Sequence, residues 1–83
     1  MPTILRHKGF RFFFFSNEGY KQAHIHVRKG SETAKFWLEP DVSLEYSYEM
    51  SPSELKEIEG IVKEQREVFK EAWNAYFGSS SSG

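Results

Sequence analysis

Two histidines, His24 and His26, are the side chains whose types and spacing are best suited to chemistry. In a β-strand, residues two apart share one face and lie about 6.5 Å apart along the chain. Such a pair has three uses. Two imidazoles bind zinc or copper, although a structural site needs four ligands and only His7 or Glu18 could approach. One imidazole acts as base and the other as acid in phosphodiester cleavage. Alternatively, the pair belongs to a surface that binds a partner.

We rank the partner surface first, ribonuclease-type chemistry second and metal binding third, because an H-x-H motif in a strand is weak evidence by itself. The ribonuclease alternative uses His24, His26 and Arg28 as its catalytic group. In it Arg28 or Lys35 stabilises the charged phosphorus intermediate. The sequence has no Gly-rich phosphate loop and no Ser/His/Asp order. We therefore predict no cofactor and no metal, and we favour a protein that is not an enzyme.

The elements that position this pair are predicted to be a small, mainly antiparallel sheet and one long helix, an α+β domain. Alternating apolar residues and turn residues indicate strands at residues 3–8, 10–15, 23–28 and 33–38, and a weaker fifth strand or extended loop at 42–48. The single domain spans residues 1–78, and residues 79–83 form a disordered Ser/Gly tail that packs nothing.

The helix is the most strongly indicated element. Ser51-Pro52-Ser53-Glu54 is a capping box with proline at the first helical position. Apolar residues at helical spacing predict one unbroken helix from Pro52 to Phe77, roughly 39 Å long, with Gly78 as its C-cap. Gly60 inside this helix indicates close packing on the sheet or a kink.

Alternation along the strands divides the side chains between two faces. One face holds the apolar residues that the helix covers, and a single helix cannot cover the other face as well. That other face is predicted to carry Arg11, Phe13, Phe15, His24, His26, Arg28, Lys35 and Trp37. For Phe13 and Phe15 we expect burial under the Asn17–Gln22 loop. The remaining six residues (Arg11, His24, His26, Arg28, Lys35 and Trp37) are the predicted partner-binding surface.

Composition limits the classes of protein. The chain has 83 residues, 17% of them aromatic and none of them cysteine, so aromatic burial must replace disulfides in a small core. Residues 1–35 carry seven Lys or Arg against two acids, whereas residues 36–83 carry four against ten. This asymmetry favours a homo-oligomer or a charged partner, with nucleic acid bound only weakly. No apolar run suits a membrane span or a signal peptide, so we expect a soluble cytoplasmic domain.

Several segments together resemble a known family. They are the N-terminal Met1-Pro2-Thr3-Ile4, the aromatic strand ending near Ser16-Asn17-Glu18, the strand His24-Ile25-His26-Val27-Arg28, and the helix end Gln65-Arg66-Glu67-Val68-Phe69-Lys70-Glu71-Ala72-Trp73. Over about residues 1–77 they resemble the small bacterial domain-of-unknown-function family numbered 4160. The H-x-H-V strand and the R-E-x-x-x-x-x-W helix end are the most specific parts.

The resemblance implies a small sheet followed by one long helix. It also implies a toxin–antitoxin-like pair with another small protein encoded nearby. Two positions depart from the family pattern: Gln22-Ala23 stand where a proline pair is usual, and Gln65 stands where a helix histidine is frequent. Both departures weaken a catalytic use of the histidines. Trp73 lies on the apolar helix face, and we expect it in the core.

Overall fold

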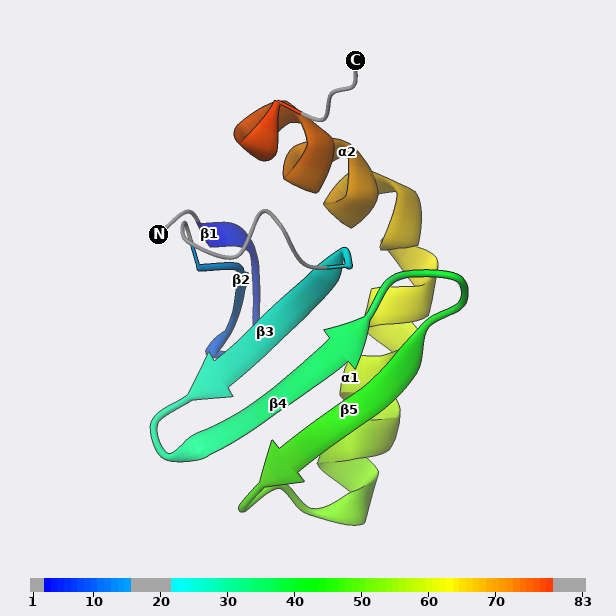
Figure 1. Ribbon diagram of the computed structural model, residues 1–83. Coiled ribbons are helices and arrows are strands. Elements are labelled where there is room, and N and C mark those ends of the chain that lie inside the picture. The colour runs from blue at the N-terminus through cyan, green and yellow to red at the C-terminus, as the bar shows by residue number, and fades with distance from the viewer. Residues whose placement is uncertain (1–2, 16–21, 79–83) are drawn as a thin grey trace.

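The computed structural model describes residues 3–15 and 22–78, and it confirms an α+β fold (Figure 1). Its elements are β1 (Thr3–His7), β2 (Phe10–Phe13), β3 (His24–Lys29), β4 (Glu32–Trp37), β5 (Ser43–Tyr48), α1 (Pro52–Glu64) and α2 (Arg66–Phe77). The five strands form one antiparallel sheet in the order β1-β2-β3-β4-β5, so each strand pairs with its neighbour in the chain. The fifth strand, predicted as strand or loop, is a strand.

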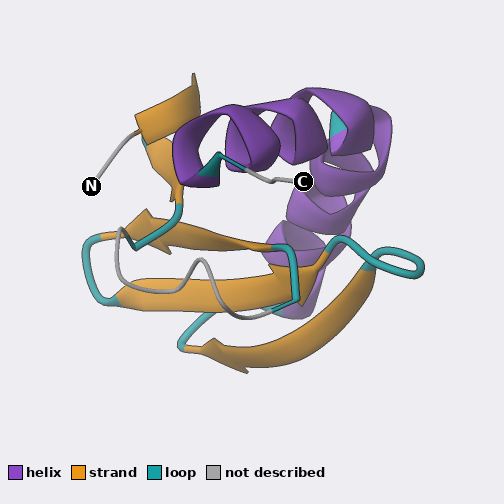
Figure 2. Cartoon of the chain, turned by 45° about the horizontal axis from the view of Figure 1, so that its top comes forward, coloured by secondary structure: helices purple, strands orange, loops and turns teal. Residues whose placement is uncertain are grey.

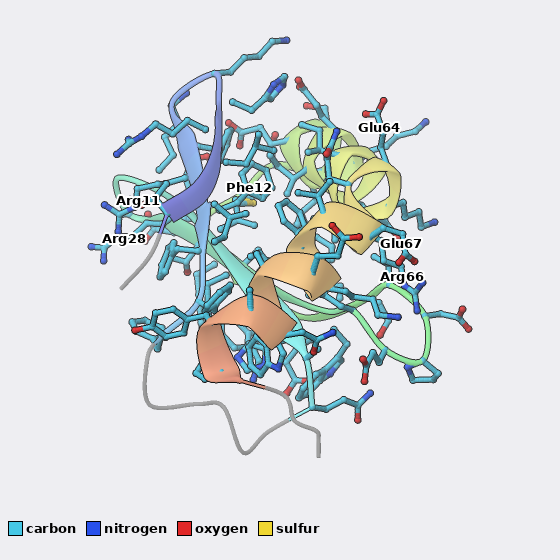
Figure 3. All side chains as sticks on the ribbon, turned by 90° about the horizontal axis from the view of Figure 1, so that it is seen from above. Arg11, Phe12, Arg28, Glu64, Arg66 and Glu67 are labelled. Carbon is cyan, nitrogen blue, oxygen red and sulfur yellow. The ribbon has the colours of Figure 1, made fainter. Side chains whose placement is uncertain are left out.

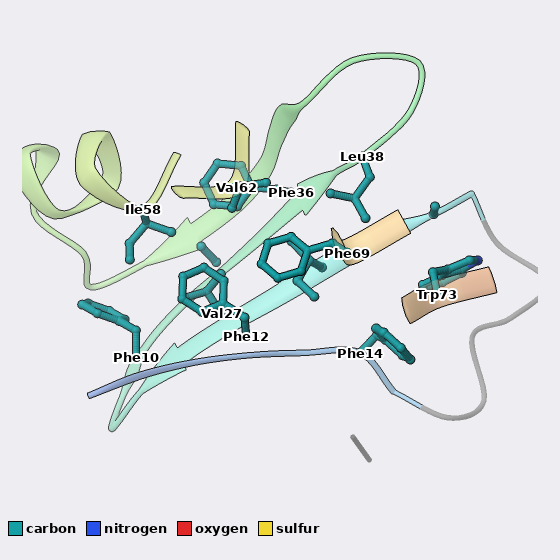
Figure 4. Close-up of a cluster of buried hydrophobic side chains, with 13 residues drawn as sticks. Phe10, Phe12, Phe14, Val27, Phe36, Leu38, Ile58, Val62, Phe69 and Trp73 are labelled. Atoms are coloured by element: carbon teal, nitrogen blue, oxygen red, sulfur yellow. The ribbon is translucent and has the colours of Figure 1, made fainter. Parts of the chain in front are cut away.

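Both helices lie on one face of the sheet, which we call the covered face (Figure 2). The predicted alternation is confirmed there, because the side chains directed at the helices make up the core (Figure 4). Phe12 and Phe69 are both fully buried, and their rings stack with centroids 5.7 Å apart. Trp73 is only 6% exposed, so its predicted place in the core is also confirmed. Large aromatic side chains supply most of the buried apolar area that a domain of this size needs.

The helix begins where the capping box predicts. The Glu54 amide donates to Ser51 Oγ at 3.1 Å, and the Ser51 amide donates to Glu54 Oε1 at 3.0 Å. Pro52 occupies the first turn, where its missing amide hydrogen costs nothing. The chain leaves the second helix through Gly78 in the left-handed conformation, with φ of 72°.

The prediction of one long helix is wrong. The helix is interrupted at Gln65, whose φ of −100° and ψ of 15° are not helical, and α2 continues in a new direction (Figure 1). The interruption is five residues beyond Gly60, which is exposed. Apart from the adjacent residues and the backbone of its own helix, no described atom lies within 4 Å of the place that a Cβ would take. Neither close packing nor a kink therefore explains this glycine.

The bend depends on contacts between the helix and the rest of the domain, which helical periodicity does not predict. Paired strands twist relative to one another, so a straight helix of roughly 39 Å does not stay aligned with the same strands along its whole length. Arg66 fastens the start of α2 to the loop after β4, where its Nε donates to the Leu38 carbonyl at 2.8 Å and its Nη2 to the Pro40 carbonyl at 3.0 Å. From there α2 places Phe69 and Trp73 over β2.

Neither helix combines the length and apolarity that crossing a membrane requires, within the residues described. Phe13 is buried, with 3% of its surface exposed, as expected, whereas Phe15 is 38% exposed, so the expectation of its burial is wrong. Residues 17–21 of the loop that was expected to cover them, and the predicted tail at 79–83, lie outside the described part of the chain.

We predict that Gly60→Ala stabilises the domain by about 1 kcal/mol, because alanine is the better helix former and meets no neighbour there. For a domain of this size this corresponds to a rise in melting temperature of roughly 4–8 °C. The matched control is Gly30→Ala, which also has open space around its Cβ but a φ of +61°. It should lower stability by about 1–2 kcal/mol. Thermal melts measure both, and a loss of stability in Gly60→Ala would contradict the prediction.

Candidate functional site

The sheet face opposite the helices, which we call the outer face, is organised in rows that run across the strands. The strand register places Arg6 beside Arg11, Arg11 beside Arg28, and Arg28 beside Thr33. A second row consists of Phe13, His26, Lys35 and Tyr46. A third row consists of His24, Trp37 and Ser43. Arginine thus lies at one end of the outer face, and aromatic side chains lie in its middle.

A β-bulge in β5 brings two tyrosines to this face. Lys35 pairs with Tyr46, whereas the next residue, Phe36, pairs with Leu44, so Glu45 has no partner across the ladder. Glu45 instead accepts a hydrogen bond of 2.6 Å from Trp37 Nε1. Because the extra residue reverses the alternation, Leu44 lies on the covered face and Tyr46 on the outer face. Uninterrupted alternation would have placed both on one side.

The histidine pair shares one face, as the spacing predicts, but the side chains are buried. His24 has no exposed surface, and His26 is 6% exposed. The His24 ring lies 4.9 Å from Trp73 and 5.6 Å from Trp37, while the His26 ring lies 4.6 Å from Phe15 (centroid distances). These rings are packed into an aromatic cluster, and this position argues against acid–base work on a polymer substrate.

The tautomer of His24 follows from the hydrogen bond that its Nδ1 makes. Its Nδ1 lies 2.8 Å from the carbonyl oxygen of Gln22, and a carbonyl only accepts, so Nδ1 carries a hydrogen. This bond satisfies a buried polar atom beside the last residues before β3. His24 therefore serves as a packed and hydrogen-bonded ring at the start of the strand.

The other predicted partner-binding residues differ in accessibility. Lys35 is 8% exposed, and its Nζ lies 4.4 Å from the Trp37 ring, a cation–π distance. Trp37 and Arg11 are half-buried and Arg28 is exposed. The strand register places all six residues on the outer face, although the His24 ring at the start of β3 also contacts Trp73 of α2. Only Trp37, Arg11 and Arg28 present much surface to a partner.

Two hollows on this side of the sheet are lined by Arg28, and the first of them also by Arg11. One is a cleft of about 310 Å³, which we call the arginine cleft, lined by Arg6, Gly9, Arg11, Arg28, Lys29 and Gly30. The other is a groove of about 150 Å³, which we call the aromatic groove, lined chiefly by Phe13, Phe15, His26, Arg28, Tyr46 and Tyr48. Phe15, Tyr46 and Tyr48 are 38%, 39% and 63% exposed.

Sequence reasoning missed Arg6, Tyr46 and Tyr48 as members of this surface. Arg6 could have been found from the alternation of β1, because it is the residue that faces Arg11 across a short hairpin. The tyrosines carried no such indication, because only the bulge at Glu45 turns them outward. In Figure 3, Arg11 and Arg28 lie beside each other, away from the helices.

Carboxylates gather at the covered side of the same end of the sheet. Burial and the facing Glu54 carboxylate raise the pKa of Glu32 above its ordinary value, with Lys29 opposing this effect. The Ser51 amide, more than Glu32 itself, lowers the pKa of Glu54. Hydrogen bonds from His7 and Lys8 lower the pKa of Glu57, and these contacts tie the β1–β2 turn to α1.

The metal alternative gains no support from the arrangement. Across residues 3–15 and 22–78, no three His, Asp or Glu side chains are grouped so that they could hold an ion. His7 is bonded to Glu57, 3.0 Å away on α1. The other suggested ligand, Glu18, lies outside the described residues.

These features define a class: a small α+β domain with a five-stranded meander, a bent pair of helices on one face, and a basic and aromatic opposite face. The chain belongs to the family described as Domain of unknown function (DUF4160), whose model matches residues 9–74. The matched range contains both histidines and Trp73, so the resemblance drawn from the sequence is confirmed. No curated protein and no solved structure matches the chain.

We predict that Glu32→Gln stabilises the domain at neutral pH and that the gain disappears in acid. The folded state holds the Glu32 proton more tightly than the unfolded state, so wild-type stability falls as pH rises above the ordinary Glu pKa. A glutamine amide donates toward Glu54 without needing that proton. Urea unfolding at pH 7 and pH 4 measures the effect, with Glu39→Gln as control. An equal gain at both pH values would contradict this explanation.

We predict that His24→Ala destabilises the domain by about 2–4 kcal/mol, because a fully buried ring leaves a cavity between two tryptophans. His7→Ala, a half-buried surface partner of Glu57, should cost less than about 1 kcal/mol. Thermal unfolding compares them. If His24→Ala melts like the parent, and the parent cleaves RNA in a way that depends on His24, the ribonuclease alternative becomes the favoured function.

Proposed function

We propose that this domain is a non-enzymatic protein-interaction module that binds its partner through the outer face. The observation that supports this most directly is the exposed aromatic surface. The fold buries six of the described phenylalanines to 6% exposure or less, yet Phe15, Tyr46 and Tyr48 remain 38–63% exposed around one groove. Aromatic residues with a polar tip are enriched at protein interfaces, where they lose water from the ring and keep a hydrogen bond.

The partner that we propose first is a second copy of the chain. A two-fold interface needs a patch that is complementary to itself, and the aromatic groove suits this because Arg28 is the one Lys, Arg, Asp or Glu among its described lining residues. The arginine row lies at one end of the outer face. Two copies packed with their strands in opposite directions therefore keep the two arginine rows apart. The open edge of β5 adjoins the same patch and adds unpaired backbone groups.

The cellular location and the kind of complex belong to the same proposal. We assign the domain to the cytoplasm of a bacterial cell, and we keep a toxin–antitoxin-like complex with a small protein encoded nearby as the other form of the interaction. The buried histidines support a binding role over the ribonuclease alternative, because a ring with 0–6% exposure does not reach a phosphodiester. Nucleic acid binding on this face, if it occurs, is expected to be weak and sensitive to salt.

We predict that the wild-type chain forms dimers or larger species at micromolar concentration and that Tyr48→Ser weakens self-association by tenfold or more, roughly 1.4 kcal/mol or above. Tyr76→Ser is the matched control, because Tyr76 is 48% exposed on α2 rather than on the outer face. Sedimentation equilibrium of the three proteins measures the effect. A wild-type chain that stays monomeric at high concentration would overturn the homo-oligomer and leave only the foreign partner.

A further inference from the structure

The arginine cleft lies where two turns meet at one end of the sheet. The β1–β2 turn supplies Gly9 and the β3–β4 turn supplies Gly30, with φ of +85° and +61°. A Cβ on Gly9 would come within 3.2 Å of the Lys29 side chain, so glycine leaves room for that lysine at the cleft wall. Arg6, Arg11 and Arg28 then extend from three neighbouring strands in one register row.

The three arginines of this cleft have no carboxylate partner in the described part of the chain. In residues 3–15 and 22–78, the ion pairs within 4 Å involve His7, Lys8, Lys63 and Arg66, and none involves the three arginines of the cleft. Arg66 shows the contrast, because it has two carbonyl acceptors and the Glu67 carboxylate. Arg11 Nε is shielded from solvent and has no acceptor among the residues that the structure describes. A buried donor without an acceptor is costly and marks a place for a ligand oxygen.

Two of the guanidinium groups are also held in position. Arg11 lies over the Phe13 ring, with its Cζ 4.9 Å from the ring centroid. Arg28 donates from Nε to the Gly30 carbonyl at 3.1 Å, so its side chain folds back toward the turn. Groups held in this way lose less conformational entropy when a ligand binds than free surface arginines do.

We propose that the arginine cleft is a binding site for a phosphate group. Three arginines from separate strands line one cleft, and a tetrahedral oxyanion offers oxygens in several directions at once. A carboxylate has two oxygens in one plane and matches a single guanidinium fork. The negative charge of a diphosphate or of neighbouring phosphodiesters also suits a cleft that holds three arginines and Lys29.

Two sources supply this chemistry: a small molecule that ends in a diphosphate, or the backbone of a single nucleic acid strand. Arg28 lines both the arginine cleft and the aromatic groove. A strand with a phosphate in the cleft can therefore extend its next base toward Tyr48, where bases stack on aromatic rings. A small diphosphate uses the cleft alone. The inference goes beyond the proposed protein partner and does not need self-association.

The test is a calorimetric titration of the full chain with pyrophosphate at low salt (about 20 mM), where charge interactions are little screened. We expect saturable binding that Arg11→Gln weakens by at least about tenfold, since it removes a charged donor. Arg11→Lys should recover only part of the loss, because lysine keeps the charge without the fork. Lys56→Gln removes the same charge from an exposed residue of α1, and this variant should bind pyrophosphate like the parent.

Further measurements distinguish the two sources of the phosphate group and show which proposal has failed if binding is not as expected. A short single-stranded RNA that binds more tightly than pyrophosphate, and loses that advantage in Tyr48→Ser, identifies a strand; equal binding identifies a small diphosphate. Tyr48→Ser keeps the cleft, so it tests self-association separately from phosphate binding. Absence of pyrophosphate binding, equal weakening by Lys56→Gln, or tighter binding of a glutamate-rich peptide than of pyrophosphate would each overturn the proposal.

Discussion

The contact between Phe12 and Phe69 is the interaction on which the rest of the structure depends. Both rings are fully buried and stack 5.7 Å apart at the centre of a core that has no disulfide to support it. To bring Phe69 over β2, the helix must change direction, and it does so at Gln65. Arg66 then fixes the new direction by bonding to carbonyl groups beyond β4. A small domain gains most from aromatic burial, so the helix bends to the sheet rather than remaining straight.

The helices cover only one face of the sheet, and the outer face carries a different set of side chains. Its middle is filled by rings that pack on one another, including His24 and His26, which are as buried as much of the core. Its margins keep exposed tyrosines and arginines. The histidines resemble a reactive pair in the sequence because their spacing is right for one face, but the neighbours that enclose them come from β2, β4 and α2. Distance along the chain does not report such enclosure.

The two faces of the sheet also differ in whether their charged side chains have partners of opposite charge. At the covered side, Lys8 and His7 meet Glu57, and Lys29 opposes the rise in the Glu32 pKa, so the basic N-terminal half and the acidic helices stabilise each other. At the outer side, Arg6, Arg11 and Arg28 meet no carboxylate among the described residues. The near-neutral total charge of −1 conceals this difference. Positive charge without a carboxylate partner among the described residues therefore lies at one end of one face.

Local patterns in the sequence determined the α+β class, the strand faces, the capping box at Ser51 and the burial of Trp73, because alternation, helical spacing and capping act between residues close in the chain. Three other features were decided only in the tertiary structure. The bend at Gln65 goes with the packing of Phe69 on Phe12 and with the bonds from Arg66 to the loop after β4. The bulge at Glu45 arises in the pairing of β5 with β4, and the arginine row depends on the register of β1, β2 and β3. Each depends on contacts between distant segments, which the residue pattern within any one segment does not specify.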